Sequence, residues 1–194
     1  MYTFLRIAVC IASFFIGWFS IRKSKTRVLK LSGSLVAVAV LLFFALFPAE
    51  NIFCSFNSPE SAFRYRYGEK AEILGVVSGA ECDLIVGKQH GRNVLLPLQK
   101  KENGWKLGVS HNLYLDSTTI CGGGFVTRYI YKGTNDAFLS VICKDSRADI
   151  SDSYESNFSL INYKTENDFW VYWISLPISA EDYELTINGE SIAF

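Results

Sequence analysis

The residues able to carry out chemistry in this chain are few and scattered. The two histidines, His90 and His111, lie near the ends of expected strands, and neither has the H-x-x-x-H, H-E-x-x-H or C-x-x-C spacing of a metal site. His111 and Cys121 are close in sequence, but a base and its nucleophile are defined by geometry, which spacing alone does not supply. We therefore expect no catalytic residue, no metal site and no cofactor, and predict that the protein is not an enzyme.

Cysteines offer a second kind of chemistry. Four of the five fall in the long C-terminal part of the chain: Cys54, Cys82, Cys121 and Cys143. Outside the cytosol an even number is typical of a two-bridge framework, so these four are candidate disulfide cysteines. A hairpin turning at residues 134–135 would place Cys143 opposite Val126, so Cys121 reaches Cys143 only if residues 122–124 fold the chain back.

Two long apolar runs, at about residues 2–21 and 31–48, precede this part. The first contains one charge, Arg6, and the second contains none. Each approaches the roughly 20 residues that a helix needs to cross a hydrocarbon core of about 30 Å. The alternative, a cleaved secretory signal, lacks an A-x-A-like site after the first run. Both runs contain small residues four apart, which predicts close packing of the two helices on each other.

A cationic segment, residues 22–30, separates the two runs. Its cations are Arg22, Lys23, Lys25, Arg27 and Lys30. Because short loops rich in Lys and Arg stay on the cytoplasmic side, we expect this loop to fix the topology. The pattern predicts a multi-pass protein of the cell membrane with two helices, in which residues 1–50 form a transmembrane hairpin in the lipid bilayer. The N-terminus and the C-terminal domain would then be extracytoplasmic.

The remaining residues, 51–194, are enough for one domain with one hydrophobic core. A short helix is predicted over 57–68, with Ser58 as N-cap, Pro59 at the first helical position and Gly68 as the stop. Short apolar runs bounded by Gly, Asn or charged residues follow, and they indicate an antiparallel meander. These runs are residues 71–77, 83–88, 93–99, 104–109, 112–115, 125–131 and 137–143.

The C-terminal end of the chain has the clearest β signals. Asn188-Gly189 between two alternating segments predicts a hairpin, whereas the polar residues 145–157 predict a surface loop. Residues 168–177, DFWVYWISLP, are apolar on both faces, which favours a central strand covered on both sides. In this strand Trp170, Tyr172 and Trp173 are candidate ligand-binding or core aromatics, and the area that such rings bury favours the core.

The predicted fold class is therefore a two-helix transmembrane hairpin followed by a predominantly β domain, an antiparallel meander or sandwich with one short N-terminal helix.

The distribution of charge argues against nucleic acid as a partner. Residues 1–50 hold six Lys or Arg and one Asp or Glu, and residues 51–194 hold 13 Lys or Arg and 18 Asp or Glu. A mildly acidic domain is a poor match for nucleic acid, which binds concentrated basic faces.

Four short motifs follow one another along residues 58–194: SPESAF at 58–63, GWK at 104–106, RYIY at 128–131 and a Tyr-to-Asn-Gly hairpin at 183–189. Their order resembles a loose, uncharacterised group of small, membrane-anchored extracytoplasmic β-domain proteins of Gram-positive, Bacillus-type bacteria. The resemblance implies a fold and a location in the cell envelope, and it implies no activity.

These observations predict a membrane-anchored extracytoplasmic β-rich binding or accessory module without catalysis, whose partner would be another envelope or membrane protein. One alternative is an extracytoplasmic thiol-dependent enzyme or redox protein that uses Cys121 or Cys143. Another is a membrane subunit that docks on a second membrane protein through the helical hairpin.

Overall fold

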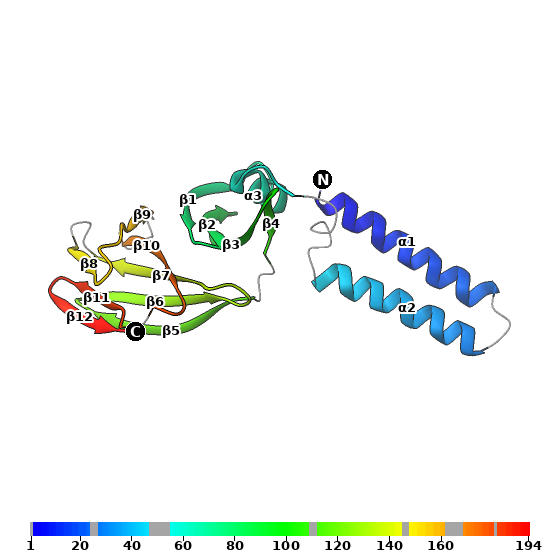
Figure 1. Ribbon diagram of the computed structural model, residues 1–194. Helices are drawn as coiled ribbons and strands as arrows, with labels where there is room; N and C mark the ends of the chain where they lie inside the picture. Colours follow the sequence, from blue (N-terminus) through cyan, green and yellow to red (C-terminus); the bar gives the residue numbers. More distant parts are fainter. Residues whose placement is uncertain are drawn as a thin grey trace. The chain divides into compact units, whose positions relative to one another are not determined.

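The computed structural model describes residues 2–23, 27–46, 55–108, 112–144, 148–161, 169–180 and 182–194. The chain divides into two compact units, Met1–Cys54 and Ser55–Phe194. The first unit holds helices α1 (Tyr2–Lys23) and α2 (Arg27–Leu46), and the second holds helix α3 (Pro59–Tyr67) and all of the strands (Figure 1).

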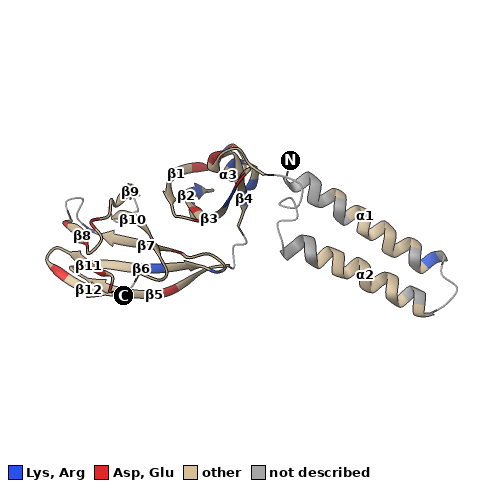
Figure 2. Cartoon of the chain, in the orientation of Figure 1, with Lys and Arg blue, Asp and Glu red and all other residues tan. Residues whose placement is uncertain are grey.

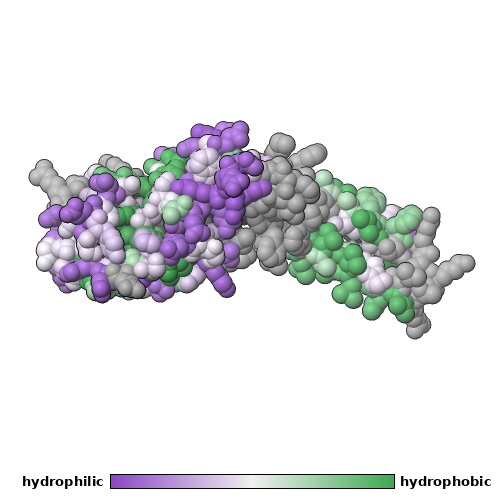
Figure 3. All heavy atoms as spheres, viewed as in Figure 1, coloured by the Kyte–Doolittle hydropathy of each residue, from purple (hydrophilic) through white to green (hydrophobic). Residues whose placement is uncertain are grey.

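Small residues bring α1 and α2 together. Ser13 is 4% exposed, and a Cβ atom added to Gly17 would lie 3.2 Å from the Cβ of Ala37. The close packing predicted from the small-residue spacing is therefore present. Large apolar side chains remain exposed on the described surface of both helices (Figure 3); among them are Ile11, Phe14, Phe15, Trp18, Val28, Leu31 and Leu35.

The prediction of a transmembrane hairpin is wrong. Among the described residues, none of the helices combines the length and the apolarity needed to cross a membrane. Three further predictions depended on these spans and are not supported. They are the contact with the lipid bilayer, the multi-pass localisation in the cell membrane, and the extracytoplasmic placement of the N-terminus and of residues 51–194.

The cationic segment also differs from its prediction as a loop over residues 22–30. Helix α1 continues through Arg22 and Lys23, and α2 begins at Arg27 and includes Lys30. Lys25 lies outside the described residues. Four of the five predicted topology cations are therefore helical, in keeping with the high helix propensity of Arg and Lys.

Helix α3 has the predicted boundaries. Ser58 caps it and accepts the N–H of Ser61, while the Ser61 side chain accepts the Ser58 N–H in return, and Gly68 ends the helix at φ +88°. The Phe63 ring is fully buried and contacts the Tyr67 ring, with centroids 4.9 Å apart. The helix therefore packs one aromatic face into the first sheet.

The strands form three antiparallel sheets (Figure 1). The first has the order β1 (Glu72–Ser78), β2 (Cys82–Gln89), β3 (Arg92–Lys101), β4 (Gly104–Leu107). The middle sheet has the order β5 (Leu113–Cys121), β6 (Gly124–Tyr131), β7 (Asp136–Cys143), β10 (Trp170–Pro177), β9 (Ser159–Ile161). The third has the order β12 (Glu190–Ala193), β11 (Glu184–Ile187), β8 (Ile150–Asp152).

The middle sheet has a hydrophobic core on each face. Phe138 and Trp173 pack with Val77 and Leu84 of the first sheet. On the other face, alternate residues pack with the third sheet: Val126, Leu139, Val141 and Ile174 with Tyr183, Leu185 and Ile187. Strand β10 pairs with β7 along its whole length and with β9 over three residues, so the predicted central strand with two covered faces is confirmed.

The C-terminal hairpin is also as predicted, with Asn188 at φ +51° and Gly189 at φ +81° between β11 and β12. The segment predicted as a surface loop over 145–157 is different, because residues 150–152 form β8 and pair with β11. A strand of three residues is stabilised mainly by pairing with its partner strand, because its own sequence has little preference for β structure.

Charge is unevenly spread over the second unit (Figure 2). Lys and Arg are interspersed with acidic residues on α3 and the first sheet, whereas acidic residues dominate the third sheet, with Asp149, Asp152, Glu184 and Glu190. The described surface therefore offers no concentrated basic face for a polyanion.

Candidate functional site

A buried carboxylate joins the first sheet to the middle sheet. Asp136, at the start of β7, is 2% exposed. Its Oδ1 accepts the N–H of Ala80 at 2.8 Å, and its Oδ2 accepts those of Glu81 and Cys82 at 2.7 and 2.6 Å. A Cβ atom on Gly79 would lie 2.7 Å from the Asp136 Cγ. All of these contacts are made within the chain, so Asp136 fixes the end of β1 and is not free to act on a ligand.

The described cysteines are buried, and no disulfide joins them among the described residues: Cys82, Cys121 and Cys143. The prediction of disulfides is therefore wrong for them, and Cys54 lies outside the described residues. Val126 pairs with Val141, two residues away from the predicted register, and a Cβ atom on Gly124 would lie 3.0 Å from the Cys143 Sγ. Gly122 and Gly123 do fold the chain back, with φ +54° and +77°, but Gly124 then stands between the strands that carry Cys121 and Cys143.

The surroundings of Cys82 and Cys121 raise the pKa of both thiols and so favour their protonated form. Burial, reinforced by the charges of Asp136 and Asp83, raises the pKa of Cys82 to about 12. Burial and then Glu190 raise the pKa of Cys121, whose Sγ–H donates to the Glu190 carbonyl oxygen at 3.1 Å. A thiolate is the reactive form of cysteine, so neither group is prepared for nucleophilic attack.

The other predicted chemical residues do not converge. His90 is exposed in the turn between β2 and β3, and His111 lies outside the described residues. Over the described ranges, no group of three or more His, Cys, Asp or Glu residues is placed to hold a metal ion. The glycines of CGGGF form the β5–β6 turn, where the Gly122 N–H donates to the Glu190 Oε2 at 2.7 Å. They therefore pack the turn against the third sheet.

The three candidate aromatics have different positions. Trp173 is 3% exposed and stacks on Tyr129 with ring centroids 5.8 Å apart. Trp170 and Tyr172 point to the opposite face of β10 and are half-buried. The strand alternation thus separates Trp173 from the other two, and the three rings do not make one platform.

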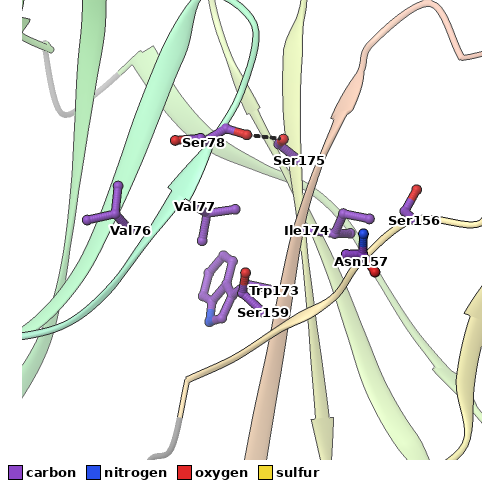
Figure 4. A pocket seen from close by; sticks show the side chains of 9 residues that line it. All are labelled: Val76, Val77, Ser78, Ser156, Asn157, Ser159, Trp173, Ile174 and Ser175. Atoms are coloured by element: carbon purple, nitrogen blue, oxygen red, sulfur yellow. Dashed lines mark hydrogen bonds between the residues drawn. The ribbon is translucent and has the colours of Figure 1, made fainter.

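Trp173 lines a cavity of about 360 Å³ at the junction of the first and middle sheets. We name this cavity the Trp173 pocket. Its walls come from β1, from β10 and from the segment leading into β9: Val76, Val77, Ser78, Ser156, Asn157, Ser159, Trp173, Ile174 and Ser175. Figure 4 shows the β1 residues on one side and Ser156 and Asn157 on the other, with β10 between them.

The pocket has an apolar, buried base and a polar, open rim. Val77 and Trp173 are buried in the core between the first and middle sheets, whereas Ser78, Asn157 and Ser159 are exposed. Ile174 also borders the pocket, but its side chain packs on the other face of the middle sheet. The Ser175 Oγ donates to the Ser78 carbonyl oxygen at 2.6 Å and ties β10 to β1 (Figure 4). Within the described residues, the buried Trp173 Nε1 has no hydrogen-bond partner.

Two local structures hold the pocket walls in place. In β1 the register shifts between Ile73 and Gly75, and a Cβ atom on Gly75 would lie 2.8 Å from the Ile161 side chain, so β1 can approach β9 only because residue 75 is glycine. On the other side, the Asp152 Oδ1 accepts the Ser156 N–H at 2.7 Å. Asp152 thereby orders the segment that carries Ser156 and Asn157.

Sequence reasoning identified Trp173 as a candidate ligand-binding or core residue but missed the serines around it. The available signal was the frequency of hydroxyl and amide residues between Ser151 and Ser159, where four serines and Asn157 occur. Which of these residues face a cavity depends on tertiary contacts with β1 and β10.

No protein-family model, no curated protein and no solved structure matches this chain.

Proposed function

We propose that the second unit, residues 55–194, is a non-catalytic binding module that holds a small ligand in the Trp173 pocket. The observation that carries the proposal is the pocket itself, which lies between two sheets and combines an apolar base with a polar rim. Its volume falls within the roughly 300–1,000 Å³ that is common for ligand pockets, and its walls are more polar than is usual, since five of the nine lining residues are serine or asparagine.

The wall is held rigidly, which favours binding. Asp136 fixes the end of β1 through three N–H groups, and the Ser175 hydroxyl bridges to Ser78. A preformed site loses less conformational freedom when it takes up a ligand, so more of the contact energy becomes affinity.

The alternative of a thiol-dependent enzyme has less support. Cys121 and Cys143 are 2% and 3% exposed, and burial raises the pKa of Cys121. A binding module needs no ionised nucleophile, and it accounts for a pocket whose described walls carry no cysteine or histidine.

Saturation-transfer NMR on the full-length chain tests the proposal with a library of small fragments. Ser156→Trp places an indole in the pocket, and Ser151→Trp makes the same change on an exposed position of β8 outside it. We expect fragments that bind the wild type and Ser151→Trp but not Ser156→Trp. Fragments that bind all three proteins equally, or no fragment binding to the wild type, would show that this cavity is not the binding site.

A further inference from the structure

We infer that the ligand of the Trp173 pocket is an uncharged saccharide unit. This inference depends on the proposed function, because it names the chemical class that the same pocket would bind. It follows from the charge, the hydrogen-bonding groups, the shape and the boundaries of the pocket.

The pocket walls carry no ionisable side chain among the described residues. The neighbouring carboxylate, Asp136, is already occupied by three backbone N–H groups. A charged ligand would lose its hydration here without gaining an opposite charge, and burying an unpaired charge is costly. The pocket therefore favours a neutral ligand.

The rim is rich in groups that both donate and accept hydrogen bonds. It contains four serine hydroxyls, those of Ser78, Ser156, Ser159 and Ser175, and the amide of Asn157. A serine hydroxyl has one donor and two acceptor sites, and an asparagine amide has both kinds of group. Ligand hydroxyls, which also donate and accept, match this mixed set.

The base of the pocket complements the other side of a sugar ring. Val77 and Trp173 are buried there, and a pyranose presents a C–H face opposite its hydroxyl edge. At about 30 Å³ per water molecule, the cavity has the volume of roughly a dozen waters. That is room for one sugar ring with its substituents.

The same geometry disfavours an extended peptide added to the sheet. Neighbouring strands lie about 4.8 Å apart, so a strand inserted between β1 and β10 would need them to be roughly 9–10 Å apart. Ser175 instead reaches the Ser78 backbone directly with its short side chain, at 2.6 Å. Strand insertion is therefore blocked at this end of the pocket.

Calorimetric titration of the full-length chain tests the ligand class. The probes are methyl glucoside, methyl galactoside and N-acetylglucosamine as neutral sugars, glucuronate and glucosamine as charged ones, and acetyl-Gly-Ser-Gly-amide as a neutral peptide. We expect at least one neutral sugar to bind, with every charged sugar and the peptide at least tenfold weaker. Asn157→Ala should weaken the neutral sugar about three- to tenfold, the effect of one net hydrogen bond, and Ser151→Trp should leave it unchanged.

The outcomes separate the ligand class from the function. If the peptide or a charged sugar binds more tightly, or if fragments occupy the pocket and no neutral sugar does, the saccharide inference is wrong while the binding module remains. If Ser156→Trp leaves sugar binding intact, the sugar binds elsewhere and the inference also fails. If neither fragments nor sugars bind, the proposed function itself is refuted.

Discussion

Replacing Asp136 with asparagine should destabilise the second unit strongly. The carboxylate accepts the N–H groups of Ala80, Glu81 and Cys82 while almost fully buried. Asparagine keeps one acceptor oxygen but presents an NH2 group to the remaining donors. A hydrogen bond to a charged group contributes about 1.5–3 kcal/mol and one between neutral groups about 0.5–1.5 kcal/mol. With the amide oxygen at the Oδ2 position, one bond is lost and the other two lose their charge, so the free energy of unfolding should fall by about 3–6 kcal/mol.

Urea denaturation followed by circular dichroism measures this free energy directly, because it falls linearly with denaturant concentration. Asp116→Asn is the matched control. Its carboxylate is 35% exposed and lies 3.8 Å from the Nε of Arg128, whose side chain is 16% exposed. At this distance the pair makes no hydrogen bond, so Asp116→Asn should cost much less than Asp136→Asn. If Asp136→Asn proves no more destabilising than Asp116→Asn, Asp136 is not the anchor between the two sheets.

Three further changes probe other parts of the fold and its thiols. Gly122→Ala should melt at a much lower temperature than Gly123→Ala. Both residues have positive φ, but only at Gly122 would a Cβ atom collide with the Ile187 carbonyl oxygen. Equal melting temperatures would contradict the packing of this turn on the third sheet. Because the pKa of Cys82 is raised from 9.0 to about 12, its contribution to stability is fully present below pH 9 and lost as pH rises toward 12. The part of the slope due to Cys82 should be at most about 1.4 kcal/mol per pH unit, while Tyr183 and Tyr129, whose pKa values burial also raises, add to the slope at higher pH. A Cys82→Ala variant that keeps the whole alkaline slope would argue against this assignment. Iodoacetamide at pH 8 should label Cys82 and Cys121 of the native chain far more slowly than in urea, and mass spectrometry that finds rapid native labelling would revive the thiol-enzyme alternative.

Local signals predicted the local structures well. Ser58, Pro59 and Gly68 mark the ends of α3 because capping hydrogen bonds and positive φ are satisfied within a few residues. Asn188-Gly189 likewise predicted its turn, since both residues tolerate left-handed backbone. Strand β10 was recognisable because a strand buried on both faces must be apolar on both faces.

Features that depend on distant contacts were not predictable. Strands β8 and β9 have three residues each, and only pairing with β11 and β10 makes them strands. The β6–β7 register was wrong by two residues, because the turn spans 132–135 and hydrophobic alternation is unchanged by a shift of two. The membrane prediction relied on apolar composition, and the described helices do not meet the combined requirement for length and apolarity.

The candidate site likewise depends on contacts that the sequence does not reveal. Trp173 could be selected from sequence as a large aromatic on a central strand. The serines that share its pocket come from β1, β10 and the segment before β9, and their meeting depends on Gly75, Asp136 and Asp152, whose roles are set by tertiary contacts.

Trp173 and Trp105 together provide the most direct measurement of the central claim that the Trp173 pocket is a ligand site. In a two-dimensional proton–nitrogen spectrum of the full-length chain, each gives an indole N–H signal; the Trp105 Nε1–H already donates to the Asp83 Oδ2 at 2.7 Å, whereas the Trp173 Nε1–H has no partner in the described residues. Saturation with a neutral sugar should move the Trp173 signal, assigned by its loss in Trp173→Phe, and leave the Trp105 signal in place. An unmoved Trp173 signal at saturation would contradict the account.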